Sequence, residues 1–403
     1  MRRDRFTPAI MMTTTPQPPR LRALTIPELE QLIVAAGFEK YRALQLFHWL
    51  QRRGARTLDE MKNIPAGLQK WLAENTEMGG IASVATMKRS ADGSYKFLFQ
   101  LDDGKKIESV LMPDPIRNYW TLCVSSQVGC AVDCKFCVTG LNGFFRQLRV
   151  DEIADQILYS RWQLMTDHPE ANFRNLVYMG MGEPLLNTEA VIKSIRILTH
   201  LEGVNLSTRR VTVSTSGIIP GMIELAESGT GVCLALSLNA PSQAEREAVM
   251  PITKKYPLAD VLEVCRKYQY GKHKRVTFEY VLLHGVNDQE EHAHRLRKLV
   301  RGTPCKINLI PFNPNSALPY ERPDNDAVEQ FAKILKEDHL TVSVRWSKAL
   351  DVDGACGQLA GQFRQRRNNA EPQPAEAPSS TAVAEMPPDL DFFSPTATDS
   401  DEE

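Results

Sequence analysis

Three cysteines in the first half of the chain could hold an iron–sulfur cluster. Cys130, Cys134 and Cys137 are spaced Cys-x3-Cys-x2-Cys. Clusters are usually bound by four cysteine thiolates, so a loop with three leaves one iron of a cubane cluster open to a substrate or cofactor. A structural zinc site is the alternative. Such sites are closed by four ligands, and no second Cys-x2-Cys or His-x3-His pair follows, so the spacing favours a [4Fe-4S] cluster.

A further thiol could act as a nucleophile. Cys356 lies among small residues, in the segment Gly-Ala-Cys-Gly after the last expected strand. A loop of this composition can reach into a neighbouring pocket, although a free structural cysteine fits the sequence equally well. Cys123 stands seven residues before the cluster motif and would lie at the entrance to the same pocket. We expect Cys233, Cys265 and Cys305 to be inert.

Beyond Asn118 the chain alternates between expected strands and helices, which predicts an α/β fold. Such alternation implies parallel strands with right-handed crossovers. Six units suit a partial (β/α)6 barrel, because eight would close a full one. The expected strands are 120–126, 175–180, 210–214, 232–238, 275–283 and 306–311, with a last strand at 341–345; the helices are 150–165, 188–201, 221–227, 258–268, 289–300 and 326–338.

Polar turns follow several of these strands, at the edge where parallel sheets bind ligands. Gly-Met-Gly-Glu-Pro follows the second strand, Ser-Thr-Ser-Gly the third, Ser-Leu-Asn the fourth and Pro-Phe-Asn-Pro the sixth. In the first of these turns, Glu183 could accept hydrogen bonds from an ammonium group. One turn alone is more often structural, but four beside a cluster loop outline a pocket for a nucleoside-sized cofactor.

Two smaller units precede the barrel. Residues 24–77 are expected to form short helices, because apolar residues recur at three- or four-residue spacing. Residues 81–112 are expected to form strands, with a hairpin turn at Asp-Asp-Gly-Lys. Glu108 lies in the second strand of that hairpin, where a carboxylate usually faces solvent. The helical unit carries basic residues that could contact RNA or simply form a solvated face: Lys40, Arg42, Arg52, Arg53 and Arg56.

Charge is distributed unevenly along the 403 residues, whose net charge is −1. Residues 368–403 contain nine Asp or Glu and no Lys or Arg, so the residues before them have a net charge of +8. A basic body attracts phosphate-rich partners, although it also favours solubility. With no apolar run of membrane-spanning length, no signal peptide and no disulfide framework, we expect a cytoplasmic protein without membrane contact.

The expected organisation of the chain has six parts. They are a disordered leader at 1–22, an RNA-contacting helical module at 23–78, a β-hairpin extension at 79–115, the partial barrel at 116–350, a catalytic-cysteine loop at 351–366 and a disordered acidic tail at 367–403.

Five motifs, taken in order, resemble the RlmN family of the radical S-adenosylmethionine superfamily. The resemblance runs from about residue 24 to residue 362, and the cysteine triplet alone is the signature of the superfamily. The motifs are Val-Ser-Ser-Gln-Val-Gly-Cys from Val124, Met-Gly-Met-Gly-Glu-Pro-Leu from Met179, Arg-Val-Thr-Val-Ser-Thr-Ser-Gly from Arg210, Lys-Ile-Asn-Leu-Ile-Pro-Phe-Asn-Pro from Lys306 and Ala-Cys-Gly-Gln-Leu from Ala355.

The resemblance implies a dual-specificity methyltransferase acting on carbon 2 of adenine in 23S rRNA and tRNA. Cys356 would receive a methyl group from one S-adenosylmethionine, and a radical from a second would take a hydrogen atom from it. The methylene radical would add to adenine and leave a thioether between enzyme and RNA. Glu108 would then remove the carbon 2 proton, and Cys123 would resolve the thioether by forming a disulfide with Cys356. The target base must leave its stack to be reached.

The resemblance also implies partners and cofactor contacts. These are a one-electron donor such as flavodoxin, a monomeric enzyme, and contacts to S-adenosylmethionine from Gly182, Glu183, Ser214, Ser237, Leu238, Asn239 and Asn313. The sequence departs from the family pattern in three places. Lys-Ala-Leu-Asp-Val-Asp-Gly at 348–354 replaces the usual Arg-Gly-x-x-Ile-x-Ala, Asn239 stands where His is frequent, and two extra residues separate Glu108 from Cys123.

Two alternative functions stay open at this point. The related Cfr group modifies carbon 8 of the same ribosomal adenine, and Gly-Glu-Pro with a full-length amino-terminal module favours carbon 2. A non-catalytic iron–sulfur protein that binds RNA is the alternative from a different class.

Overall fold

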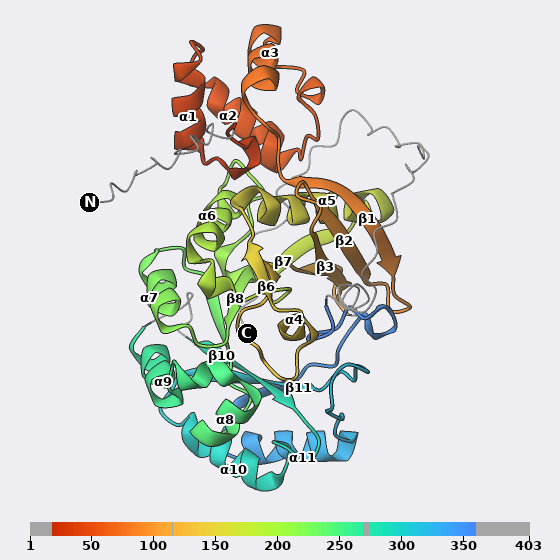
Figure 1. Ribbon diagram of the computed structural model, residues 1–403, viewed down its shortest axis with the longest axis vertical. Coiled ribbons are helices and arrows are strands. Elements are labelled where there is room, and N and C mark those ends of the chain that lie inside the picture. Colours follow the sequence, from red (N-terminus) through yellow and green to blue (C-terminus); the bar gives the residue numbers. More distant parts are fainter. Residues whose placement is uncertain (1–17, 115, 269–274, 360–403) are drawn as a thin grey trace, which may run out of the picture.

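The computed structural model describes residues 18–114, 116–268 and 275–359. These residues form one ten-stranded sheet and a separate two-stranded hairpin (Figure 1). The strands are β1 (Ile81–Arg89), β2 (Tyr95–Leu101), β3 (Lys106–Pro113), β4 (Tyr119–Cys123), β5 (Gln127–Gly129), β6 (Phe144–Gln147), β7 (Asn172–Tyr178), β8 (Val211–Thr215), β9 (Cys233–Ser237), β10 (Val276–Leu282), β11 (Cys305–Pro311) and β12 (Thr341–Val344).

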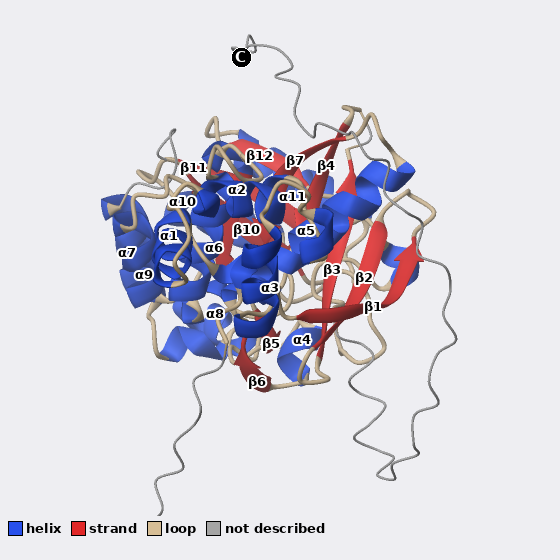
Figure 2. Ribbon diagram, turned by 90° about the horizontal axis from the view of Figure 1, so that it is seen from above, coloured by secondary structure: helices blue, strands red, loops and turns tan. Residues whose placement is uncertain are grey.

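The helices lie mainly to one side of strands β1, β2 and β3 in the view from above (Figure 2). They are α1 (Ile26–Ala35), α2 (Arg42–Phe47), α3 (Ala66–Asn75), α4 (Val138–Leu141), α5 (Val150–Asp167), α6 (Thr188–Thr199), α7 (Ile219–Glu227), α8 (Gln243–Val249), α9 (Leu258–Lys267), α10 (Glu290–Leu299) and α11 (Asn325–Lys336).

The sheet confirms the predicted partial barrel. Its order is β1-β2-β3-β4-β7-β8-β9-β10-β11-β12, and every pair from β4 to β12 is parallel. Strands β1 and β12 are the two edges, so the barrel stays open among the described residues. The sequence reading missed the β5–β6 hairpin, α4 and α8, because these elements are only three to seven residues long and periodicity cannot identify such short runs.

The outer helices form where apolar residues recur on one face. In α11, Val328, Phe331 and Leu335 recur at three- and four-residue spacing and are buried. The helix begins after Asp324, whose carboxylate accepts a hydrogen bond from the backbone N–H of Ala327 at 2.7 Å and so caps the first turn. This amphipathic pattern places α11 against the sheet, and the same logic applies to α6 and α9.

The amino-terminal helices form a compact module with its own apolar core. Leu29, Phe47 and Leu68 belong to that core, and Ile197 of α6 joins it from the barrel. Arg22 also crosses to the barrel, where its guanidinium contacts the Asp155 carboxylate at 2.5 Å with both groups buried. The module therefore rests on α5 and α6, above the barrel in Figure 1.

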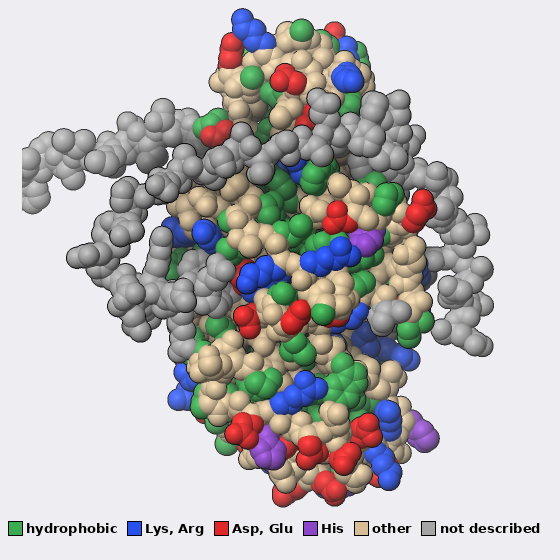
Figure 3. All heavy atoms as spheres, turned by 90° about the vertical axis from the view of Figure 1, so that its right-hand side faces the viewer, with side chains coloured by type: hydrophobic (Ala, Val, Ile, Leu, Met, Phe, Trp, Pro, Cys, Tyr) green, Lys and Arg blue, Asp and Glu red, His purple; other side chains and the backbone are tan. Residues whose placement is uncertain are grey.

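Three antiparallel strands, β1 to β3, continue the sheet beyond β4, so the segment expected as a β-hairpin extension is part of the same layer. The expected tail at 367–403 and most of the expected leader lie outside the described residues. No helix in the described part of the chain combines the length and the apolarity needed to cross a membrane. On the face seen in Figure 3, basic and acidic side chains are interspersed over the barrel.

Candidate active site

The segment from Cys130 to Cys137, which we call the cluster loop, is held by backbone hydrogen bonds. The Cys130 N–H donates to the Gly143 carbonyl at 2.9 Å, and the Lys135 N–H donates to the Val249 carbonyl at 2.9 Å. Strands β5 and β6 pair on either side of the loop. The sequence folds back here because Gly129 and Gly143 both adopt positive φ, a conformation that glycine takes without strain.

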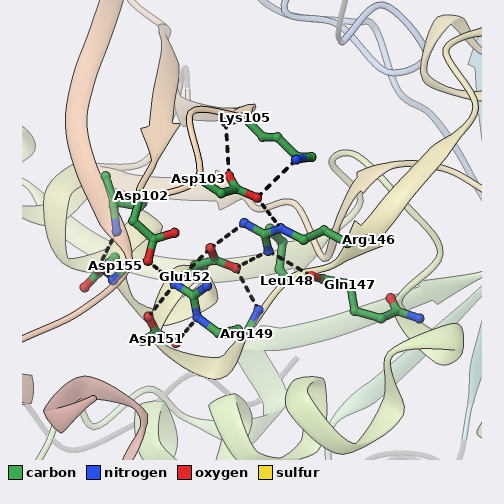
Figure 4. Close-up of polar contacts among 12 residues, drawn as sticks. Asp102, Asp103, Lys105, Arg146, Gln147, Leu148, Arg149, Asp151, Glu152 and Asp155 are labelled. Atoms are coloured by element: carbon green, nitrogen blue, oxygen red, sulfur yellow. Dashed lines mark hydrogen bonds and ion pairs between the residues drawn. The ribbon is translucent and has the colours of Figure 1, made fainter. Parts of the chain in front are cut away.

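A network of charged side chains fixes the far end of the β5–β6 hairpin. Arg146 donates two hydrogen bonds of 2.8 Å to the fully buried Glu152 at the start of α5. Arg149 also contacts Glu152 and Asp102, and Asp103 contacts Arg146 at 2.7 Å. Figure 4 shows these groups converging from the β2–β3 turn, the hairpin and α5. Since a buried carboxylate is stable only when paired, this network ties the end of β6 to the start of α5 and to the β2–β3 turn.

The three cluster-loop cysteines line a single cavity at the carboxyl ends of the strands. This central cavity contains about 950 Å³ of empty space, part of which is open to solvent. No three His, Cys, Asp or Glu side chains of the described residues are close enough to share one metal ion, whereas in a cubane cluster each thiolate binds its own iron. Other lining residues are Gly182, Glu183, Ser214, Ser237, Asn239, Asn313 and Cys356.

The Gly-Glu pair expected to bind cofactor lies where β7 ends. Gly182 has a φ of +98°, and a Cβ there would lie 2.4 Å from the Gln127 side chain, so only glycine fits. Glu183 is buried and accepts hydrogen bonds from the N–H groups of Leu185 at 3.0 Å and Ser216 at 2.7 Å. Burial raises the pKa of this carboxyl although those donors oppose the shift, so a cationic ligand would favour its charged form.

The remaining expected cofactor contacts divide into two groups. Asn239 takes a left-handed conformation, and its Oδ1 accepts the Val281 N–H at 2.8 Å. Asn313 has a buried Oδ1 without a hydrogen-bond partner among the described residues, which leaves it open to a ligand. Leu238 differs from these, because its side chain is fully buried in the core and does not line the cavity.

The segment 348–359, which we call the thiol loop, brings Cys356 to the central cavity. The Asn313 amide donates to the Cys356 carbonyl at 3.0 Å, and the Val138 N–H donates to the Gly357 carbonyl at 2.7 Å. The loop therefore rests directly on the residue that follows Cys137. This arrangement agrees with the expectation that Cys356 reaches the cluster loop.

Cys123 and Cys356 share a second cavity, which is lined also by Val110, Met112 and Arg345. We call it the side cavity; Cys356 lies on the wall between it and the central cavity. Burial raises the pKa of the Cys123 thiol to about 12, and the neighbouring Cys356 adds to that shift. Burial also raises the pKa of Cys356, while the Arg345 guanidinium opposes the change. Both thiols are therefore neutral near pH 7.

Glu108 does not face solvent, contrary to the usual case for such a strand position. It is 1% exposed, and its Oε1 lies 3.0 Å from Lys96 Nζ. In β3, Glu108 alternates with Ile107 and Ser109, so it points to the same face as Val110. Val110 lines the side cavity and pairs with Cys123 in the sheet. The base expected from the resemblance thus lies on the side of the sheet that faces the two thiols.

Sequence reasoning missed three charged residues around this site. Arg246 is fully buried in α8 and donates to the carbonyls of Ser216 at 2.6 Å and Leu238 at 3.0 Å, which fixes two strand ends. Glu279 lines the central cavity, and Arg345 lies 3.8 Å from it. The signal available was a charged residue inside an apolar strand, such as Glu279 in Thr-Phe-Glu-Tyr-Val.

Comparison with known proteins decides the family. Residues 124–296 match the model of the radical SAM superfamily, and residues 20–78 match that of the ribosomal RNA large subunit methyltransferase N-terminal domain. A dual-specificity RNA methyltransferase RlmN from Anaeromyxobacter sp. is 46% identical over 86% of this chain and 92% of its own length. The chain belongs to the RlmN family.

Other RlmN relatives agree with this assignment. The enzyme from Geobacter sulfurreducens is 44% identical over 85% of this chain and 92% of its own length. A crystal structure of a radical SAM methyltransferase from Sphaerobacter thermophilus superposes with a TM-score of 0.80, at 40% identity, over 85% of this chain and 99% of its own. The protein is therefore a radical S-adenosylmethionine enzyme that methylates RNA, and the non-catalytic alternative is wrong.

Membership of the RlmN family implies a [4Fe-4S] cluster and S-adenosylmethionine, and the residues of the central cavity fit both. Three thiols of one loop would hold the cluster, while the carboxylate of Glu183 and the open Oδ1 of Asn313 suit the amino and hydroxyl groups of the cofactor. The assignment also favours a cluster over the structural zinc site.

One departure from the RlmN pattern has a steric explanation. In the segment 348–354, the RlmN pattern usually has Gly at the second position and Ala at the last. Here the two residue types are exchanged, as Ala349 and Gly354. A Cβ on Gly354 would lie 2.7 Å from the Cβ of Ala349, so the fold has room for only one of the two methyl groups. Ala349 adopts a φ of +56°, which costs an L-residue about 1–2 kcal/mol. The exchange keeps the loop closed at the expense of backbone strain.

Proposed function

We propose that this enzyme methylates carbon 2 of adenine in 23S rRNA and in tRNA, with Cys356 as the methyl carrier. The observation that carries the proposal is the position of Cys356 on the wall between the central cavity, lined by the cluster-loop cysteines, and the side cavity, lined by Cys123. A thiol in that place can reach two different partners without a change of fold.

In this proposal the two cavities serve two halves of the reaction. When bound, the cluster and S-adenosylmethionine supply the radical that activates the methyl group on Cys356, so two molecules of S-adenosylmethionine are used per turnover. Asn313 positions that methyl group by holding the Cys356 backbone at 3.0 Å, and Gly182 lets the turn after β7 pack against Gln127 at the edge of the central cavity.

The second half frees the methylated base. Glu108 takes the proton from carbon 2 of the thioether-linked adenine, and the unpaired electron left by the radical addition would pass to the cluster when it is bound. The Cys123 thiol then loses its proton and its sulfur attacks the Cys356 sulfur. The carbon–sulfur bond breaks, its electron pair leaves with the carbon, and that carbon takes up a proton to become the product methyl group. An external thiol reductant then reduces the disulfide before the next turnover. Cys123 is buried and Cys356 is partly buried, and the raised pKa values of both thiols keep them in the neutral form, which is less reactive than the thiolate.

The proposal extends to partners. The amino-terminal module, which matches the RlmN N-terminal domain, would contact RNA through its basic side chains, among them Arg53, whose guanidinium lies 4.6 Å from the centre of the Trp49 ring. A one-electron donor such as flavodoxin would reduce the cluster, and we infer a monomeric, cytoplasmic enzyme.

Nucleoside mass spectrometry of treated RNA tests the target atom. Purified enzyme with reconstituted cluster, S-adenosylmethionine and reductant is incubated with 23S rRNA fragments or tRNA that lack the modification. We expect 2-methyladenosine from both RNAs. Formation of 8-methyladenosine would instead assign the enzyme to the Cfr reaction, and product from ribosomal RNA alone would remove the tRNA half of the proposal.

A further inference from the structure

Lys96 lies between the carboxylate of Glu108 and the backbone of the thiol loop. Its Nζ is 3.0 Å from Glu108 Oε1 and donates a 2.9 Å hydrogen bond to the Asp353 carbonyl. The Lys96 side chain is 10% exposed and that of Glu108 is 2% exposed. A buried ammonium group needs several oxygen partners, so this lysine is stable only while both neighbours stay in place.

Strand register explains how one lysine reaches both groups. In the β2–β3 pair, Lys96 is opposite Val110 and Leu98 is opposite Glu108. Opposite residues of an antiparallel pair point to the same face, and diagonal neighbours are within reach of long side chains. Lys96 and Glu108 are such a diagonal pair, on the face whose Val110 and Met112 line the side cavity.

Other contacts join the first half of the thiol loop to the β1–β2 turn and the end of β3. The Asp92 carboxylate accepts the Ala349 N–H at 2.8 Å, and Asp351 accepts the Ala91 N–H at 2.9 Å. Lys348 donates to the Pro113 carbonyl. The second half of the loop rests on the barrel instead, through Asn313. Of the side chains that hold the thiol loop through these contacts, only Lys96 also contacts a group, Glu108, whose charge changes in the proposed reaction.

We propose that Lys96 is a positioning residue that couples Glu108 to the thiol loop. The inference rests on the roles proposed above for Glu108 and Cys356. While Glu108 is charged, Lys96 stays beside it and holds the Asp353 carbonyl, which keeps Cys356 turned to the central cavity. When Glu108 accepts the proton from carbon 2, its attraction for Lys96 weakens. The thiol loop is then released at the step in which Cys356 must react with Cys123.

The test measures exposure of the thiol loop in cluster-loaded enzyme, without RNA and without turnover. The rate of Cys356 alkylation by iodoacetamide is followed by peptide mass spectrometry, and hydrogen–deuterium exchange is followed for residues 348–356. We expect Lys96→Met to raise both rates roughly tenfold, because a hydrogen bond from a charged group is lost. Lys88→Met is the matched control, since Lys88 is the exposed β1 residue directly opposite Lys96.

A double-mutant cycle tests the coupling itself. Glu108→Gln imitates the protonated carboxyl and should raise the same two rates, and Lys96→Met added to it should raise them little further, because the two changes remove one interaction. Lys96→Arg, which keeps charge and donors, should restore rates close to those of the unchanged enzyme. Rates in Lys96→Met equal to those in Lys88→Met would overturn the proposal, as would full additivity in the double variant.

Two further outcomes are distinguishable. If Lys96→Met does not fold or does not bind the cluster, the alkylation and exchange rates of Glu108→Gln are compared with those of Lys96→Arg and of the unchanged enzyme. Unchanged rates in Glu108→Gln overturn the coupling. If the unaltered enzyme forms no 2-methyladenosine, the proposed function fails, while the exposure rates still report whether Lys96 holds the loop.

Discussion

The cluster loop and the thiol loop meet at one cavity, but the chain holds them by different means. The cluster loop is held by backbone hydrogen bonds within the β5–β6 hairpin and by the buried charge network around Glu152. The first half of the thiol loop is held by side chains, among them Asp92 and Lys96, and contains two non-glycine residues with positive φ, Ala349 and Asp353.

This difference matches the role proposed for each loop in the reaction. Three irons need fixed thiolates, whereas Cys356 must turn from one cavity to the other. Contacts made by a few side chains open at lower cost than a hydrogen-bonded strand pair. The comparison therefore predicts that changes in the cluster loop abolish all chemistry, and that changes around the thiol loop stop the reaction at defined intermediate stages.

The largest effect should come from removing one thiol of each loop. Cys134→Ala should lose the visible absorption of the cluster and, with it, cleavage of S-adenosylmethionine to 5′-deoxyadenosine, because two thiolates cannot hold the cubane. Cys356→Ala should keep the cluster and still cleave the cofactor, yet form no methylated adenosine. Absorption spectra and chromatography of anaerobic reactions measure both. Methylated RNA from Cys356→Ala would break the comparison.

Glu108→Gln loosens the thiol loop in the proposal above, but it should block chemistry only in the second half of the reaction. Loss of a general base lowers turnover by about 10²- to 10⁴-fold, while methylation of Cys356 itself continues. The enzyme–RNA thioether should therefore accumulate, which denaturing gel electrophoresis with labelled RNA detects. If Cys356 is not methylated in this variant, Glu108 acts earlier than we propose.

The pH dependence of alkylation should distinguish the resolving thiol from an ordinary one. Burial raises the pKa of Cys123 to about 12, against about 8.5 for an unfolded cysteine. At pH 8 the thiolate fraction is therefore roughly a thousandfold lower in the folded enzyme, and the alkylation rate should still be rising at pH 10. Rates are compared with those of urea-unfolded enzyme. A plateau near pH 9 in the folded state would contradict the buried position of Cys123.

The smallest effects should come from two glycines, Gly182 next to the cluster loop and Gly354 within the thiol loop. Gly182→Ala next to the cluster loop should cost about 1–3 kcal/mol, because the added Cβ overlaps Gln127 and nothing nearby can yield. Gly354→Ala should cost a similar amount, but Ala349→Gly removes the clash and should restore the melting temperature in the double variant. Thermal unfolding of the cluster-loaded proteins measures this. A double variant no more stable than Gly354→Ala would disprove the steric exchange.

Sequence reasoning found what is encoded locally. The alternation of strands and helices gave the parallel sheet, and the cysteine spacing gave the cluster loop, because each depends on residues close together in the chain. Only the family resemblance predicts Glu108 as the base, since its own strand position is typical of a solvent-facing carboxylate. The contacts of Lys96 and Asp92 with the thiol loop join residues about 257 positions apart. No local pattern marks such a pairing, and only the folded sheet reveals it.

The most direct measurement of the central claim is the trapping of the enzyme–RNA intermediate. Cys123→Ala retains the methyl carrier and the base but lacks the thiol that resolves the thioether. After anaerobic reaction and digestion, mass spectrometry should find an adenosine joined through a methylene bridge to the peptide that contains Cys356. An adduct on any other residue, or release of 2-methyladenosine by Cys123→Ala at the normal rate, would contradict the account.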